Sequence, residues 1–211
     1  MGRTVRYLSR YILSAAAAMT GIFSVVCFFL ALPFRTDESL FARYYGMSPV
    51  LAVFCLLLFW LTVGGYYGRT AISMGASRRS FFWGAQAVLV LGALLTLALV
   101  ALSLFLPGWF RVGWLSPPIP PAFLPLFLGL ILFSQELGFF LSFFVSRSRW
   151  LMVLAFLIAT LILGVGTVLF LLGTRSLLPV LGSAWVTAGI PAGAVALGAL
   201  SWLPLSKFTV R

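Results

Sequence analysis

The chain alternates between long runs of apolar residues and short segments that hold nearly all of its charged side chains. A helix needs about 20 residues to cross the hydrocarbon core of a bilayer, and six apolar runs reach that length. We expect the spans at residues 11–32, 49–68, 81–106, 122–145, 150–172 and 184–205. Open strands would leave backbone groups unsatisfied in lipid, so the runs predict helices. The pattern therefore predicts an all-α membrane protein with six transmembrane helices in a single domain, residues 1–211.

Prolines lie near the ends of several runs, where they are expected to end the helices. Pro33 follows the first run, Pro107 and Gly108 follow the third, and the proline-rich segment 116–121 precedes the fourth. These positions agree with the boundaries that the apolar runs predict.

The composition places the chain in a bilayer. Hydrophobic residues make up 63% of its 211 residues and charged residues 8%, which is too little polar surface for a soluble protein of this size. The formal net charge of +11 would suit nucleic acid only if the cations formed one water-facing surface. They instead lie between apolar runs, so we expect no nucleic-acid partner.

The positions of the cations predict the orientation of the chain, because cytoplasmic segments carry an excess of Lys and Arg. With the N-terminus inside, the inner segments hold Arg3, Arg6, Arg10, Arg69, Arg78, Arg79, Arg147, Arg149, Lys207 and Arg211. The outer loops then hold Arg35, Arg43, Arg111 and Arg175. This asymmetry predicts that both termini are cytoplasmic.

The N-terminal segment has an amphipathic pattern. Its arginines recur at helical spacing, and Val5, Leu8 and Ile12 recur on roughly the opposite face. The segment either lies along the inner leaflet before turning into the first span, or serves only as a basic anchor that fixes the orientation. Both alternatives place arginines against anionic headgroups, so membrane lipids are expected partners.

The residue types present exclude several kinds of chemistry. The chain has no His, and its two cysteines, Cys27 and Cys55, lie in separate apolar runs, so neither a metal centre nor a structural disulfide is expected. There is no phosphate-binding loop motif, and Lys207 is the only lysine. An intramembrane enzyme would need a nucleophile with a base, or paired acids. The chain has no His to act as the base, and Glu136 is the one acid inside an apolar run. We therefore do not expect the chain to be an enzyme by itself.

Glu136 is an acidic residue inside the fourth apolar run, beside Gln135. A carboxylate is costly in lipid unless it faces protein or water, is paired, or is protonated. Glu136 is a candidate polar contact in a translocation path, and Gln86 of the third run is a possible hydrogen-bonding neighbour. The alternative is a structural role, in which Glu136 pairs with an arginine near the inner interface.

A polar segment, residues 69–80, joins the second and third runs. Its core Gly75-Ala76-Ser77-Arg78-Arg79 is followed at once by aromatic residues. Ser73 or Ser77 can cap a short helix, Gly75 permits a bend, and the two arginines can meet acidic groups on a partner. The alternative is an ordinary inner loop whose arginines only obey the orientation rule.

The amphipathic N-terminus, the six spans and the stretch at residues 75–84 together resemble a small bacterial permease of the ABC-type-2 exporter superfamily. The resemblance implies that segment 69–80 holds a short cytoplasmic coupling helix seated on an ATP-binding subunit, with Ser73, Gly75, Ser77, Arg78 and Arg79 as coupling residues. It also implies that ATP and Mg bind to that separate ATPase. A second permease protomer, identical or related, would complete the pathway in the bacterial cytoplasmic membrane.

The chain departs from the family pattern in one respect, and two other functions remain open. Only residues 173–183 are available for the re-entrant element that the family often places before the last span, so any such element must be short. The apolar, aromatic spans favour an amphipathic or lipid-like cargo, such as a peptide, antibiotic or lipid. A proton-coupled carrier that uses Glu136, and a membrane assembly or regulatory subunit that transports nothing, remain the alternatives.

Overall fold

The computed structural model describes residues 2–35, 39–115, 121–145, 150, 153, 157 and 184–206. Its long helices are α1 (Gly2–Ala17), α2 (Phe23–Ala31), α3 (Leu40–Thr62), α5 (Arg78–Trp109), α6 (Leu124–Val145) and α8 (Ala184–Ser206), with the short α4 (Gly68–Ser73) after α3. No strand occurs within these ranges. Five stretches of the described chain are long and apolar enough to cross a membrane. The prediction of an all-helical, multi-pass membrane protein is confirmed at that level.

The five stretches are Arg6–Phe34, Leu40–Ser73, Arg78–Trp109, Leu124–Val145 and Ala188–Ser206. They correspond to the first, second, third, fourth and sixth predicted spans. The predicted fifth span, residues 150–172, lies outside the described residues except at three positions, and segment 173–183 lies wholly outside them.

The amphipathic N-terminal segment does not turn before the first span. A π-helical segment, Ala18–Ile22, joins α1 directly to α2, so one helix continues to the 3₁₀ turn Leu32–Phe34 around Pro33. Leu8 and Ile12 are buried against α5, in a cluster that includes Phe81. The apolar face of α1 thus packs on protein, which explains why the segment continues as a helix of the bundle.

The second span begins well before the predicted residue 49. Ser39 caps α3, with its side-chain oxygen accepting a hydrogen bond from the Ala42 N–H at 3.2 Å. Pro49 therefore lies inside α3. A second π-helical segment, Val63–Tyr67, joins α3 to α4, so the helix continues to Ser73. The prediction placed the start at the proline because the residues before it are more polar.

The third span, α5, continues beyond Pro107, the proline that was expected to end it. Pro107 lies in the last turn of α5, and the chain leaves the helix at Phe110 and Arg111, where the backbone is left-handed with φ of 55° at Arg111. A proline has no N–H to donate to the carbonyl four residues before it. It fits inside a helix where that carbonyl accepts a hydrogen bond from another donor.

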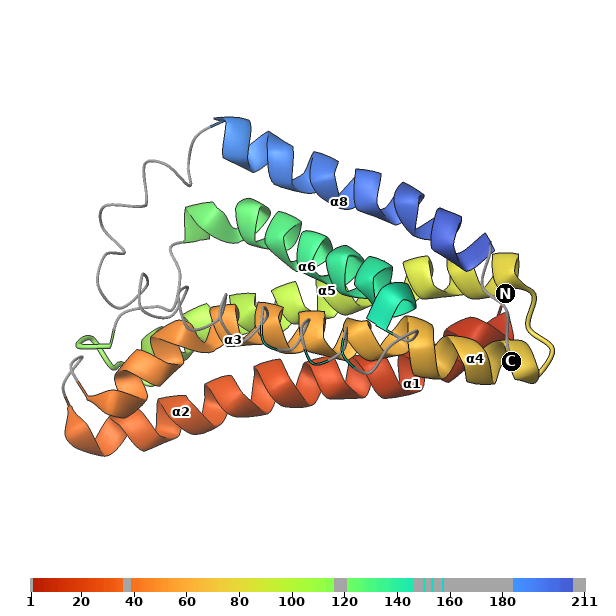
Figure 1. Ribbon diagram of the computed structural model, residues 1–211. Helices are drawn as coiled ribbons and strands as arrows, with labels where there is room; N and C mark the ends of the chain where they lie inside the picture. Colours follow the sequence, from red (N-terminus) through yellow and green to blue (C-terminus); the bar gives the residue numbers. More distant parts are fainter. Residues whose placement is uncertain are drawn as a thin grey trace.

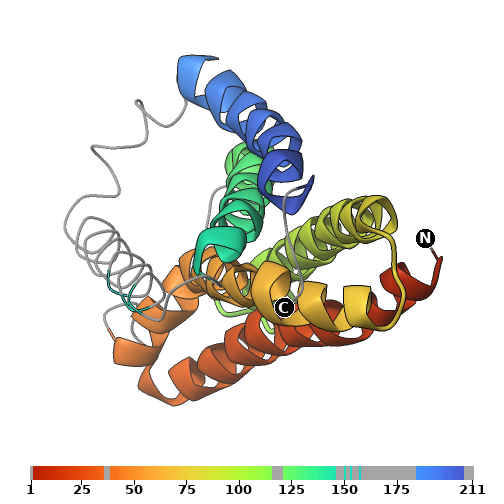
Figure 2. The ribbon, with the colours of Figure 1, turned by 45° about the vertical axis from the view of Figure 1, so that its right-hand side comes forward.

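The helices form a bundle in which α6 packs between α3 and α8, and α1 packs along α5 (Figure 1). Figure 2 shows α8 on the outer side of α6, away from α1 and α2. Gly138 permits the close approach of α6 to α3, because a Cβ there would lie 2.6 Å from the Leu57 carbonyl oxygen.

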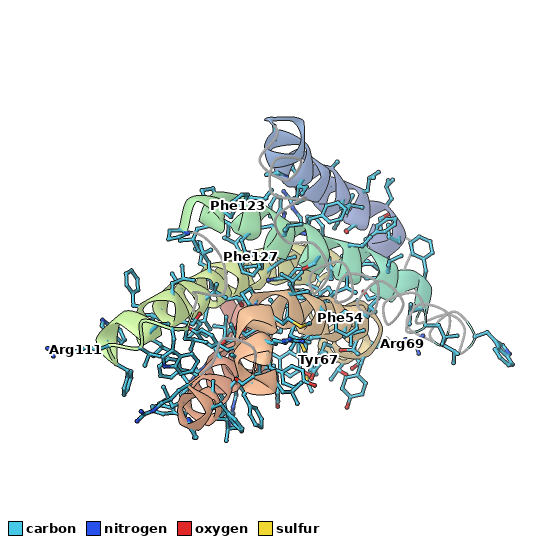
Figure 3. The ribbon with its side chains drawn as sticks, turned by 90° about the vertical axis from the view of Figure 1, so that its left-hand side faces the viewer. Phe54, Tyr67, Arg69, Arg111, Phe123 and Phe127 are labelled. Carbon is cyan, nitrogen blue, oxygen red and sulfur yellow. The ribbon has the colours of Figure 1, made fainter. Side chains whose placement is uncertain are left out.

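The start of α1, the connection between α4 and α5, and the end of α8 lie at one end of the bundle (Figure 1). Arg69 belongs to α4, at this end, and Arg111 follows α5, at the opposite end; Figure 3, viewed from that opposite end, labels both residues. Most of the described arginines, namely Arg3, Arg6, Arg10, Arg69, Arg78 and Arg79, belong to segments at the first end, which we call the basic end.

Candidate functional site

Glu136 of α6 is buried in the bundle, with 5% of its surface exposed. The Gln86 side chain of α5 donates a hydrogen bond from Nε2 to Glu136 Oε2 at 3.3 Å. On the other side lies α8, where a Cβ at Gly198 would sit 2.9 Å from Glu136 Oε1. The carboxyl group therefore occupies space between α5 and α8 that exists because residue 198 is a glycine.

The contact between Gln86 and Glu136 is the one that the sequence suggested, since two polar side chains in neighbouring apolar helices are expected to meet. A neutral amide donor stabilises a buried carboxyl group without adding a second charge. The alternative, pairing with an arginine near the inner interface, would involve Arg147 or Arg149, which lie outside the described residues.

Gln135 is next to Glu136 but faces a different side of α6. It is fully buried near Gly92 of α5, where a Cβ would lie 3.7 Å from Gln135 Oε1. Neither its Oε1 nor its Nε2 has a hydrogen-bond partner, and the same holds for the hydroxyl of buried Thr96, one turn further along α5. Leaving a buried polar group without a partner costs about 1–3 kcal/mol, so such groups favour contact with a polar molecule.

The segment between the second and third spans differs from the expected coupling helix. The helix that began at Leu40 ends at Ser73, and α5 begins at Arg78, so the two are joined by residues 74–77, here called the α4–α5 turn. Within the described chain, no separate helix stands between them. The six residues of α4 are instead the last turns of the second span.

Gly75 and Ser77 give the α4–α5 turn its shape. Gly75 has a left-handed φ of 88°, its N–H donates to the Ile72 carbonyl at 3.0 Å, and the Ala76 N–H donates to the Ala71 carbonyl at 3.0 Å. This is the Schellman cap that commonly ends a helix at glycine. Ser77 then caps α5, with its side-chain oxygen accepting from the Ser80 N–H at 3.1 Å. The Ser73 hydroxyl donates to the backbone carbonyl oxygen of Thr70 within α4, so Ser73 does not cap the start of a helix.

The two arginines of the segment have different surroundings. Arg78 donates a hydrogen bond from Nη1 to the carbonyl oxygen of Ser206, at the end of α8, at 2.6 Å. Arg79 is exposed. Carbonyls in the last turn of a helix lack intrahelical donors, and a cation there is favourable. Arg78 therefore links the start of α5 to the end of α8, a contact that the sequence did not suggest.

Aromatic packing strengthens the same link. Phe81 and Phe82 are buried within the bundle, and the ring of Phe82 lies 5.3 Å from that of Trp202 in α8. Leu205, also of α8, is buried in the same cluster. The last turns of α8 are thus anchored on the first turns of α5.

Comparison of the chain with protein-family models, with curated proteins and with solved structures finds no match. A functional assignment therefore depends on the buried polar group around Glu136, the α4–α5 turn, and the helices that connect them.

Proposed function

We propose that the chain is the membrane-spanning permease subunit of an ATP-driven exporter in the bacterial cytoplasmic membrane. A separate ATPase subunit binds ATP and Mg and docks at the basic end, which is cytoplasmic. A second permease protomer, identical or related, encloses the pathway with the first. The cargo is an amphipathic or lipid-like compound, such as a peptide, an antibiotic or a lipid.

The observation that carries this proposal is the hydrogen bond from Arg78 to Ser206. It connects the α4–α5 turn to α8, and α8 presents Gly198 to the carboxyl group of Glu136. Displacement of the turn by a docked subunit would move the end of α8 and thereby change the space around Glu136. The fold thus supplies a mechanical path from the basic end to the buried polar group.

The α4–α5 turn is accessible to a soluble partner. Met74 is 74% exposed, and Gly75, Ser77 and Arg79 are exposed beside it. A guanidinium that pairs with a carboxylate at a desolvated interface forms strong charge-assisted hydrogen bonds. We infer an acidic groove on the ATPase as the matching surface, with Arg79 as the docking cation and Arg78 retained for α8.

Arg79→Glu tests docking without removing the contact between Arg78 and Ser206. Because one desolvated charge pair becomes repulsive, we expect association with the ATPase to weaken about tenfold or more at equal membrane levels. Arg43→Glu makes the same charge change at the start of α3, at the opposite end of the bundle, and is the control. Equal association of both variants would contradict docking at the turn.

A proton-coupled carrier is the second candidate, because Glu136 is a buried carboxyl group with a neutral donor. Transport measured with ATP alone, or with a proton gradient alone, separates the two mechanisms. Under either mechanism we expect Glu136→Ala to reduce transport, and Glu136→Gln, which keeps an acceptor for Gln86, to reduce it less. Unchanged transport in both variants would favour a structural role for Glu136, or a subunit that transports nothing.

A further inference from the structure

The continuous helix α1–α2 presents a shallow hollow at the basic end, lined by Arg6, Tyr7, Arg10 and Tyr11. Arg6 and Arg10 lie one turn apart and are exposed, whereas Leu8 and Ile12 on the other face are buried against α5. The buried face fixes the rotation of α1. The arginines are therefore held on the outer surface of the bundle.

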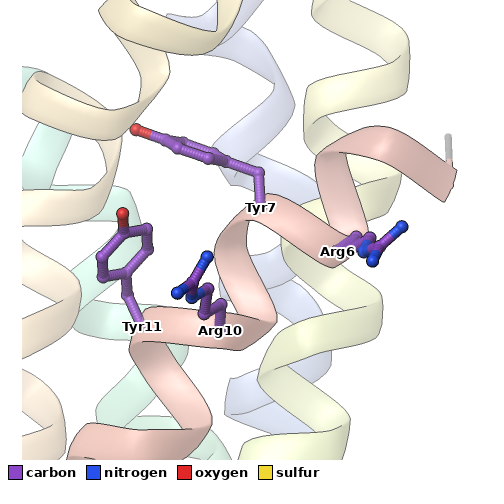
Figure 4. Close-up of a pocket in the computed structure, with 4 residues that line it drawn as sticks. All are labelled: Arg6, Tyr7, Arg10 and Tyr11. Atoms are coloured by element: carbon purple, nitrogen blue, oxygen red, sulfur yellow. The ribbon is translucent and has the colours of Figure 1, made fainter.

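The two tyrosines are positioned by a third, Tyr67, at the end of the second π-helical segment. The ring of Tyr67 lies 6.0 Å from that of Tyr7 and 5.8 Å from that of Tyr11, and the rings of Tyr7 and Tyr11 lie 5.8 Å apart. Figure 4 shows Arg10 between Tyr7 and Tyr11 along the helix, with both phenol groups directed to one side and Arg6 directed to the other. Guanidinium groups are hydrogen-bond donors that match the oxygens of a phosphate.

The hollow carries positive charge that the chain does not neutralise from within the described residues. The whole chain has three acidic residues. Glu136 is buried in α6 and accepts a hydrogen bond from Gln86. Asp37 and Glu38 follow the C-terminal end of the continuous helix in the sequence, whereas the hollow lies near its N-terminal end. Two arginines without acidic neighbours attract an anion.

The surface beyond the hollow is apolar. Further along the same helix, Ile22 is 63% exposed and Phe29 47% exposed, with Val25 exposed between them. A ligand that has its anionic group in the hollow can lay hydrocarbon along this face. This arrangement favours a lipid over a free phosphate ion, because a free ion would gain nothing from the apolar face.

We propose that Arg6, Tyr7, Arg10 and Tyr11 form a binding site for the phosphate of an anionic phospholipid headgroup. The guanidinium groups donate to the phosphate oxygens, and the rings of Tyr7 and Tyr11, packed on Tyr67, form the wall of the hollow beside Arg10. The acyl chains lie along the exposed face of α1 and α2. The bound lipid also holds α1 against the second span through Tyr67.

The test is titration of the full chain, purified in a neutral detergent, with short-chain phosphatidylglycerol, and native mass spectrometry measures occupancy. We expect Arg6→Gln with Arg10→Gln to weaken binding about 25-fold, because each basic residue near an anionic lipid contributes about 1 kcal/mol. Arg35→Gln with Arg43→Gln removes the same charge from other segments and should leave affinity unchanged. Tyr7→Phe with Tyr11→Phe keeps the rings that form the wall and should leave the affinity largely unchanged.

Phosphatidylcholine of equal chain length and inorganic phosphate are the comparison ligands, and both should bind more weakly than phosphatidylglycerol. Equal losses in the two arginine pairs would overturn the proposal, because only the overall charge would then matter. Displacement of the lipid by an equal concentration of inorganic phosphate would overturn the lipid assignment. The assay contains no ATPase, so its result is independent of whether an ATPase docks at the α4–α5 turn.

Discussion

The hydroxyl of Tyr45 in α3 donates a hydrogen bond to the backbone carbonyl of Ser103 in α5. Ser103 is four residues before Pro107, so its carbonyl is the acceptor that the proline, with no N–H, leaves unpaired. The carbonyl of Tyr45 is in the same position relative to Pro49, and the Ser48 hydroxyl donates to it at 2.8 Å. Hydroxyl groups thus replace the backbone donor at two prolines inside membrane helices.

Tyr45→Phe should destabilise the protein, because the buried Ser103 carbonyl loses its donor while the ring packing is kept. The expected decrease in the free energy of unfolding is about 1–2 kcal/mol, the range for interhelical hydrogen bonds in membranes. Denaturant unfolding in detergent measures it. Tyr44→Phe, at an exposed neighbouring position, is the control. An equal effect of the two substitutions would show that the hydroxyl of Tyr45 contributes nothing.

Gly198→Ala should be destabilising because of Glu136. The new methyl group would lie 2.9 Å from Glu136 Oε1, so α6 and α8 must separate or the carboxyl group must move. We expect a loss of about 1–3 kcal/mol, the range for overpacking, that is much smaller in the Glu136→Ala background. Gly189→Ala meets no atom within 4 Å and should not destabilise. Equal losses with and without Glu136 would contradict the contact.

Arg78→Ala should loosen the end of α8 while leaving the rest of the bundle intact. Ser206 would lose its donor, and the exposed link costs little to break, so global stability should change by less than about 1 kcal/mol. Hydrogen exchange of the amides in residues 200–206 should accelerate. Arg79→Ala is the matched control and should leave that exchange unchanged. Identical exchange in both variants would remove Arg78 from the proposed path to α8.

Cysteine labelling in intact cells tests the proposed orientation. In a background with Cys27 and Cys55 replaced by Ala, a cysteine at Trp114 should react with a membrane-impermeant reagent, because the proposed orientation places the α5–α6 connection outside. A cysteine at Ser77 should react only after the membrane is opened. Labelling of position 77 from outside would place the basic end on the wrong side for an ATPase.

The sequence predicted the described spans well because apolar runs interrupted by charges leave few other arrangements in a bilayer. It also suggested that Gln86 meets Glu136, since both are polar residues within apolar helices. It did not predict the extension of α3 to Leu40, because the donor that accommodates Pro49 is a single serine hydroxyl. The roles of Gly198 and Ser206 could not be predicted, because each depends on which helix packs beside α6 or α5.

We propose that a separate ATPase docks on this chain at the α4–α5 turn. The most direct measurement is ATP hydrolysis in material purified through a tag on the chain from its native membrane, compared with Gly75→Pro. Proline cannot adopt the φ of 88° at position 75, so the variant should insert in the membrane but lose the shape of the turn. We predict ATP hydrolysis with the unmodified chain and a loss of most of it with Gly75→Pro at equal membrane levels. Absence of ATP hydrolysis from the unmodified chain, or equal hydrolysis with both, would contradict the account.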